Sequence, residues 1–261
     1  MARKRSEKSL IITLLSDFGS FYPAQMKGVI LSRLQGKSEN IAGKITFVDI
    51  AHDIPAQDVR AGAFALLCTV RFFPPGTIHI AVVDPGVGTA RRGLVVESGG
   101  QMFAGPDNGL LIPAARSLGR PTAHEIALPP GASSTFHGRD VFAPAAALIA
   151  AGQPPASLGP RVQPVDLDFG EAKKTARGLE ATIIYVDRFG NLILNLQRLP
   201  AQDMMLKGVR LKRVRTYAEG RRIEPLITLG SHGFAEIAIN QGNASEAFCL
   251  KAQDRIELEE I

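Results

Sequence analysis

Residues 82–93, "VVDPGVGTARRG", run from two β-branched residues into an aspartate, a Pro-Gly turn and a glycine-rich loop that ends in two arginines. The overlapping run 78–83, "IHIAVV", has the composition of a buried strand. In parallel α/β sheets, ligand crevices form just beyond the carboxyl ends of the strands. Asp84 and Arg91, which follow this strand, are therefore candidates for chemistry at the edge of such a sheet.

Short β-branched runs alternate with helix-like segments around this stretch, which is the pattern of a parallel sheet covered by helices. The first two helix-like segments each carry a proline near their first turn. We therefore expect a Rossmann-like α/β/α domain over residues 9–165. Its expected strands are 11–15, 45–50, 78–83, 93–98 and 101–105, and its expected helices are 23–34, 55–73 and 139–152.

The composition changes after Gly152. Residues 153–174, "QPPASLGPRVQPVDLDFGEAKK", contain several prolines and glycines without periodicity, which indicates a linker. We place the boundary at 166–178, between the α/β domain and a C-terminal β domain at 179–261. Short strand-like runs separated by turns predict a small β-barrel-like or sandwich fold there. These runs are 180–187, 191–196, 209–217, 221–229, 234–240 and 255–261, with one short helix at 244–250.

Composition limits the class of protein. A hydrophobic share of 45% in 261 residues supplies a core without disulfides, and the apolar surroundings of Cys68 and Cys249 predict buried reduced thiols. The apolar run 10–15 is too short for an export signal, and no run approaches the roughly 20 apolar residues that span a bilayer. We expect a cytoplasmic protein without a membrane partner.

Charge and acidic clusters point to neither nucleic acid nor metal. The formal net charge of +5 is concentrated in the tail 2–8 and in 207–215, and no aromatic stacking motif accompanies it. The segment 49–58, "DIAHDIPAQD", contains residue types that bind metals. Its proline and its change from strand to helix scatter those side chains, so a helix start is favoured and no metal is expected.

Two further segments place polar side chains at element ends in the first half of the chain. Asp17 in "LLSDFGS" follows an apolar strand, where it accepts hydrogen bonds from a ribose diol or simply forms a turn. No G-x-G-x-x-G follows, so a dinucleotide site is not indicated. His137 in "STFHGRDVFAP" lies at a loop-to-helix junction, a position from which it reaches a ligand near the helix N-terminus.

The second half carries two comparable segments. Asp187 and Asn191 flank an Arg-Phe-Gly turn, and the set suits a polar ligand with a heterocycle and an ammonium group. Ser231 precedes a strand, where it can hold a carboxylate together with backbone donors. Glu236 falls within that strand, so its burial requires a partner.

Together the segments "SDFG", "MKGVI", "AHDIPAQDVRAGAF", "FFPPGTIHIAVVDPGVGT", "GPDNGLL", "TFHGRDVFAP", "DRFGN" and "EIAINQGNA" resemble the S-adenosyl-L-methionine hydroxide adenosyltransferase family, relatives of the fluorinase and chlorinase enzymes. The match runs in order from about residue 11 to the end. It implies an N-terminal α/β domain, a C-terminal β-barrel-like domain and a homotrimer whose active sites lie between subunits. S-adenosylmethionine is then the substrate, no cofactor is needed, and the products are adenosine and L-methionine.

The resemblance also assigns residues. Asp84, Arg91 and His137 match the set associated with the attacking water, and whether Asp84 or His137 accepts its proton stays open. Substrate-binding roles carry over to five positions: Asp17 for the ribose, Asp187 for the methionine ammonium, Asn191 for adenine, Ser231 for the methionine carboxylate, and Glu236 as part of the hydrolase-like pattern. The loop that contains Tyr22 is shorter than usual and His232 replaces an arginine of the fluorinase, which leaves these contacts open.

Two alternatives remain beside hydrolysis. The fluorinase has Tyr and Ser where this chain has Asp84 and Gly138, and an anionic Asp84 would repel a halide ion in a site of low dielectric constant. Hydrolysis is therefore favoured over halogenation. A non-catalytic adenosine or S-adenosylmethionine sensor would keep Asp17, Asp187 and Asn191 without depending on the water-activating set.

Overall fold

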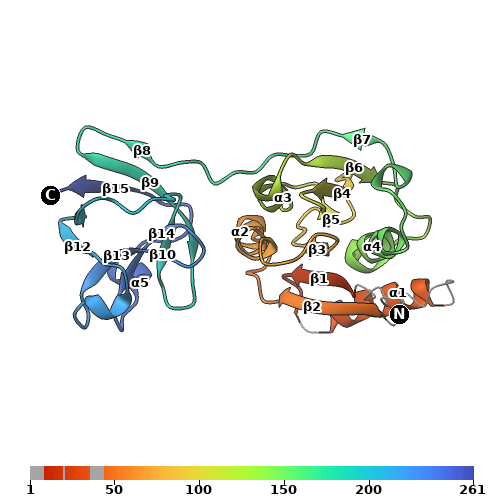
Figure 1. Cartoon of the computed structure of the whole chain (residues 1–261), viewed down its shortest axis with the longest axis horizontal. Helices are drawn as coiled ribbons and strands as arrows, with labels where there is room; N and C mark the ends of the chain where they lie inside the picture. The colour runs from red at the N-terminus through yellow and green to blue at the C-terminus, as the bar shows by residue number, and fades with distance from the viewer. Residues whose placement is uncertain (1–8, 20, 36–43) are drawn as a thin grey trace, which may run out of the picture. The chain divides into compact units, whose positions relative to one another are not determined.

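The computed structural model of the chain describes residues 9–19, 21–35 and 44–261, so the basic tail at 2–8 lies outside the described residues. The chain divides into two compact units, the first ending at Asp168 and the second comprising Phe169–Ile261. Figure 1 shows the elements of each unit.

A mixed seven-stranded sheet forms the centre of the first unit, in the order β2-β1-β3-β5-β4-β6-β7. The first four strands in this order are parallel, and each remaining strand is antiparallel to its neighbour. The Rossmann-like expectation is therefore confirmed only as a general α/β architecture. The strands are β1 (Leu10–Ser16), β2 (Ile45–Ala51), β3 (Ile78–Val82), β4 (Gly93–Ser98), β5 (Gln101–Pro106), β6 (Thr122–Ile126) and β7 (Arg161–Val162).

Two pairs of helices cover the sheet of the first unit. Helices α1 (Tyr22–Leu34) and α4 (Ala143–Ala150) pack together on one face, and α2 (Val59–Val70) and α3 (Ile112–Leu118) pack together on the other (Figure 1). Helix α2 begins later than expected from the sequence because the side chain of Asp58 caps it, accepting the backbone N–H of Ala61 at 2.9 Å. The sequence prediction missed α3 and β6.

The second unit is a closed seven-stranded barrel, because β9 pairs both with β15 and with β10 at the two ends of the strand order β10-β14-β13-β12-β11-β15-β9. Apolar side chains from these strands fill its interior, among them Ile183, Leu211 and Ile237. The strands are β9 (Gly178–Val186), β10 (Leu192–Leu194), β11 (Met204–Leu206), β12 (Val209–Arg213), β13 (Pro225–Leu229), β14 (Ala235–Ile239) and β15 (Arg255–Glu260), and α5 is Ala244–Phe248.

The segment 153–174 contains more structure than its composition indicated. Pro155–Ser157 forms a 3-10 turn, β7 pairs with β6, and β8 (Lys173–Lys174) pairs with β9. The prediction of two buried thiols is wrong for Cys249, which is exposed beyond the end of α5. Burial raises the pKa of Cys68 to about 12, so that thiol is inert. In the described ranges no helix is long and apolar enough to cross a membrane.

Candidate active site

The strand order of the first unit places two predicted site residues side by side. The chain passes from β1 outward to β2 and then returns to β3 on the other side of β1, so the strand order reverses between β1 and β3. Ligands of open α/β sheets bind at the carboxyl ends of the strands at such a reversal. Ser16 and Val82 are partners in the β1–β3 register, and Asp17 and Asp84 follow them by one and two residues.

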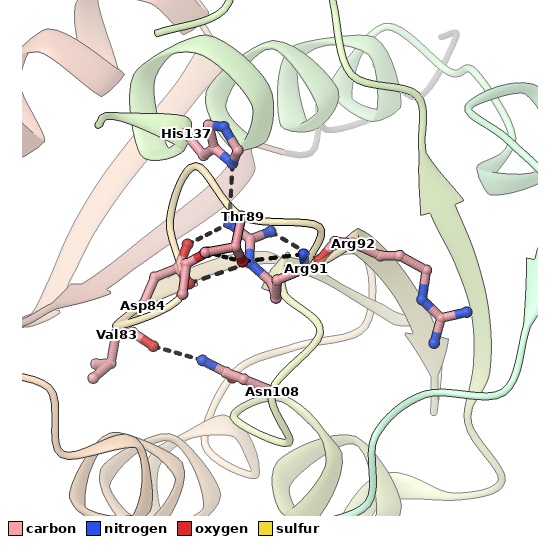
Figure 2. Close-up of polar contacts among 8 residues, drawn as sticks. Val83, Asp84, Thr89, Arg91, Arg92, Asn108 and His137 are labelled. Carbon is pink, nitrogen blue, oxygen red and sulfur yellow. Dashed lines mark hydrogen bonds and ion pairs between the residues drawn. The ribbon is translucent and has the colours of Figure 1, made fainter. Parts of the chain in front are cut away.

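Asp84, Arg91 and His137 form one connected cluster at this edge (Figure 2). The Arg91 guanidinium donates Nε–H to Asp84 Oδ1 at 3.2 Å and Nη2–H to Asp84 Oδ2, a bidentate ion pair. Arg91 Nη2 also lies 3.0 Å from His137 Nδ1. The side chains of Asp84 and Arg91 are only 5% and 9% exposed, so water screens their charges poorly. The structure therefore brings together all three residues of the predicted water-activating set.

The hydrogen bond between Arg91 and His137 determines the state of the imidazole. A guanidinium is only a donor, so His137 Nδ1 accepts and the ring carries its proton on Nε2. Burial and the Arg91 charge both lower the pKa of His137, which agrees with a neutral ring. Burial raises the pKa of Asp84 in spite of the opposing charge of Arg91. Arg91 is thus the fixed positive charge of the cluster.

The loop at 84–92 takes its shape from a close approach to a distant segment. Gly88 has φ +77°, and a Cβ there would lie 2.3 Å from the carbonyl oxygen of Ser134. Only glycine fits, and the contact brings residues 134–137 against the loop. The guanidinium of Arg91 also lies over the Phe142 ring, 5.5 Å from its centroid. These contacts bring His137 within hydrogen-bonding distance of Arg91.

A turn of π-helix, Gly138–Phe142, follows His137 and leads into α4. Its defining hydrogen bond runs from the backbone N–H of Ala143 to the carbonyl of Gly138. A Cβ on Gly138 would lie 3.0 Å from the Phe136 ring and 3.2 Å from Met26 Sδ. A larger residue at this position would therefore require its neighbours to move.

Arg92 and the 107–108 turn have a structural task beside the cluster. Arg92 forms an ion pair with Asp107, whose side chain is 2% exposed and also accepts the backbone N–H of Val165 at 2.7 Å. Asn108 Nδ2 donates to the carbonyl of Val83 at 2.8 Å, which fixes the chain just before Asp84 (Figure 2). These contacts hold both ends of the loop that carries Asp84 and Arg91.

Asp17 lies beside the β2–α2 loop. Its Oδ2 accepts the backbone N–H of Gln57 at 2.8 Å, and Gln57 has a left-handed φ of +66°. The sequence prediction missed this partner, because a backbone donor carries no side-chain signal. Tyr22 packs edge-on against Phe18 and Phe136, with ring centroids 5.9 and 5.2 Å away.

In the second unit, the Asp187–Asn191 turn lines a cavity of about 660 Å³, a size typical of small-molecule sites. Asp187 Oδ1 accepts the backbone N–H of Phe189 and of Asn191, and Asp187 Oδ2 accepts Asn191 Nδ2–H, all at 2.9 Å. Phe189 is 76% exposed in this turn. Tyr217 and residues 239–243 complete the lining, and no sequence signal had singled out Tyr217.

Glu236 is buried in β14 and its two oxygens have donors. Tyr217 Oη–H donates to Oε1, and His232 Nε2 lies 3.0 Å from Oε2. The backbone N–H of Phe234 donates to His232 Nδ1, so the ring proton is on Nε2 and points at Glu236. A Cβ on Gly230 would lie 2.4 Å from His232 Nε2 and 2.6 Å from Glu236 Oε2, so a side chain there would displace both partners of this hydrogen bond. Ser231, next to this network, is exposed.

The predicted site residues thus form separate groups within the units: Asp17 and the Asp84–Arg91–His137 cluster in the first, and Asp187, Asn191, Ser231 and Glu236 in the second. Over the ranges that the structure describes, no group of three or more His, Cys, Asp or Glu side chains is arranged to hold a metal ion. The ligand types of segment 49–58 have other tasks, since Asp58 caps α2 and Asp49 binds Lys27 and His52.

Comparison with known proteins gives consistent matches along the chain. Residues 12–159 match the model of the SAM hydroxide adenosyltransferase N-terminal domain, and residues 181–257 match that of the C-terminal domain. A Thermus thermophilus protein named (R)-S-adenosyl-L-methionine hydrolase is 42% identical over 92% of this chain and 96% of its own length. A Methanocaldococcus jannaschii protein of the same name is 35% identical over 95% of both chains.

A more distant relative and a solved structure also match nearly the whole chain. A fluorinase from an Actinoplanes species is 28% identical over 93% of this chain and 95% of its own. The crystal structure of an uncharacterized conserved protein from Thermotoga maritima superposes with a TM-score of 0.81 at 30% identity, covering 95% of this chain and 99% of that one.

Proposed function

The chain belongs to the SAM hydroxide adenosyltransferase family, and on this premise we propose that it hydrolyses S-adenosyl-L-methionine to adenosine and L-methionine. Hydrolases are closer to it than fluorinases among the relatives described above, at 35–42% against 28% identity. The observation that carries the mechanism is the buried Arg91 guanidinium, which bridges the Asp84 carboxylate and a neutral His137.

The sulfonium of the substrate already makes methionine a neutral leaving group, so the enzyme needs no acid on that side. The oxygen of a water attacks C5′ of the ribose, the C5′–S bond breaks, and its electron pair stays on sulfur. Arg91 stabilises the negative charge that develops on the attacking oxygen. Holding that oxygen in line with C5′ and sulfur supplies a further part of the rate enhancement.

Asp84 is our candidate for the group that takes the proton of the water. The lone pair of His137 Nδ1 faces Arg91, and the other ring nitrogen carries a proton, so the imidazole has no free basic site in this arrangement. Burial raises the pKa of Asp84, which makes it a better base than an exposed aspartate. His137 then orients Arg91 and donates from Nε2.

Substrate contacts follow the family pattern. We assign the ribose hydroxyls to Asp17, the methionine ammonium to Asp187, adenine to Asn191 and the carboxylate to Ser231. Glu236 supports this site through Tyr217 and His232, since both of its oxygens accept hydrogen bonds from them. We further propose a homotrimer with active sites between subunits, a cytoplasmic location and no cofactor.

Halogenation is the less favoured outcome within the family. A carboxylate at position 84 repels a halide, and a serine at position 138 would crowd the Phe136 ring and Met26.

The test is product analysis of purified protein with S-adenosylmethionine in ¹⁸O-labelled water, with and without chloride and a metal chelator. We expect equimolar adenosine and methionine, with the label on the 5′-oxygen of adenosine and no effect of chloride or chelator. Formation of a 5′-halogenated nucleoside would show that the protein is a halogenase and not a hydrolase. Tight binding of S-adenosylmethionine without turnover would identify a sensor.

A further inference from the structure

A chain of four side chains lies behind Asp17, outside the water-activating cluster. Ser16 Oγ lies 2.7 Å from His52 Nδ1, His52 Nε2 lies 3.0 Å from Asp49 Oδ1, and Lys27 Nζ donates to Asp49 Oδ2 at 2.6 Å. Its members come from the end of β1, from β2, from the β2–α2 loop and from α1. These hydrogen bonds therefore link three separate segments to the strand end that precedes Asp17.

The direction of these hydrogen bonds follows from the charge of Asp49. Although burial raises it, the hydrogen bonds from Lys27 and His52 and the charge of Lys27 hold the pKa of Asp49 below its ordinary value. In the neutral form of the ring, His52 donates Nε2–H to the Asp49 carboxylate, and His52 Nδ1 accepts the Ser16 hydroxyl proton. The order resembles that of a Ser-His-Asp hydrolase triad. Ser16 is only 1% exposed, however, so its oxygen has no access to a substrate carbonyl and is not a nucleophile.

The β2–α2 loop makes two more hydrogen bonds to the segment around Asp17. The carbonyl of His52 accepts the backbone N–H of Gly19 at 3.1 Å, and the backbone N–H of Gln57 donates to Asp17 Oδ2 at 2.8 Å. Contacts from the 52–57 loop thus reach the residue before Asp17, the Asp17 carboxylate itself and the residue two positions beyond. The hydrogen bond from Gln57 to Oδ2 restricts the orientation of the Asp17 carboxylate before any ligand arrives.

We propose that the Ser16–His52–Asp49–Lys27 chain is a positioning device that sets the Asp17 carboxylate to receive the ribose hydroxyls, and so makes the site select ribonucleosides over 2′-deoxyribonucleosides. The inference rests on the proposed function, in which Asp17 contacts the ribose. His52 is a positioning residue, since it acts through Asp17 and the loop. A bidentate contact to two hydroxyls depends strongly on the orientation of the carboxylate.

The test compares His52→Ala with His52→Asn, whose amide oxygen replaces the Nδ1 acceptor for Ser16. The control is His124→Ala, which removes another half-buried histidine of the same unit, hydrogen-bonded to the carbonyl of Gly159 at 3.1 Å. We expect His52→Ala to raise KM for S-adenosylmethionine about tenfold, which corresponds to about 1.4 kcal/mol. We expect kcat to change by less than about threefold, and His52→Asn to restore part of the loss.

Binding of adenosine and 2′-deoxyadenosine by calorimetry separates this inference from the proposed function, because it needs no turnover. Wild-type protein should prefer adenosine, and His52→Ala should lose that preference by weakening adenosine alone. In an Asp17→Asn background, His52→Ala should add nothing. The inference would be overturned if the wild-type protein bound adenosine and 2′-deoxyadenosine equally well. It would also be overturned if His52→Ala weakened the binding of both nucleosides equally, left the preference for adenosine unchanged, or lowered only kcat. Absent hydrolysis with an intact nucleoside preference would refute the proposed function alone.

Discussion

Replacing Asp84 by Asn removes one charge from the centre of the cluster without changing its size. Asp84 accepts two N–H groups of Arg91 through two oxygens. Asparagine offers one oxygen and an NH₂ group, so one N–H of Arg91 would face another donor. The substitution also removes the base that we assign to the water.

The expected loss follows from these two effects. Loss of a general base typically costs about 10²- to 10⁴-fold in rate. Misplacement of the Arg91 charge in a poorly hydrated site adds to it, so we expect kcat of Asp84→Asn to fall about 10³-fold or more. Because Asp84 is assigned no ground-state contact with S-adenosylmethionine, KM should change by less than about threefold.

The assay is steady-state release of adenosine, followed by chromatography. Asp107→Asn is the matched control, because it breaks the neighbouring ion pair of Arg92 with an equally buried aspartate. That variant should lose stability in thermal unfolding and keep kcat within about fivefold. A kcat for Asp84→Asn that equals that of Asp107→Asn would refute the assigned role and reduce the motif to a turn.

Three other perturbations follow from the structure. Gly88→Ala should lower kcat at least about tenfold by pushing residues 134–137 and His137 away from Arg91, since its Cβ would lie 2.3 Å from the Ser134 carbonyl. Gly131→Ala, with the same φ of +77° and nothing within 4 Å, should carry only the backbone strain; equal kcat values in the two variants would contradict this reading. Burial lowers the pKa of His79 to about 4 from 6.5, so the unfolded chain takes up the proton first as the pH falls. His79 should therefore lower the free energy of unfolding by about 3 kcal/mol between pH 6.5 and 4. Urea unfolding of His79→Gln at a series of pH values should show a dependence of the unfolding free energy on pH that lacks this contribution. Glu236→Gln should raise KM about fivefold with kcat unchanged, because the amide cannot accept from both Tyr217 and His232; a matching effect of Tyr217→Phe and a double variant no worse than either would show that the pair acts as one unit.

The composition of the sequence predicted most strands and helices of the first unit. One feature that we did not predict, the antiparallel pairing of β4 with β5, nevertheless had a signal in the sequence. Strands 93–98 and 101–105 were expected, but their antiparallel pairing was not. Gly99 and Gly100, both with positive φ, form the two-residue turn that favours a hairpin, so the reversal of direction was present in the sequence. Helix α3 has seven residues and a proline at its start, which leaves too short a pattern to recognise.

The site was predictable to the extent that its residues follow strands. Asp84 and Arg91 lie in one loop, and the position of His137 before a helix marked it as a candidate. The family resemblance then grouped His137 with Arg91, which lies 46 positions before it. The pairing of Ser16 with His52 was not predictable, since it depends on how the β2–α2 loop folds back over the end of β1. The Tyr217 donor to Glu236 was hidden for the same reason, because Tyr217 lies 19 positions away in a 3-10 turn.

The turn of π-helix after His137 constrains how this lineage can change. Relative to an α-helix, such a turn accommodates one additional residue. Deleting one residue within 138–142 would restore ordinary helix and rotate whatever precedes it by about 100° around the axis of α4. The imidazole would then turn away from Arg91. On the role that we propose for His137, a single-codon deletion in this turn should therefore abolish catalysis while leaving the helix itself more regular than before.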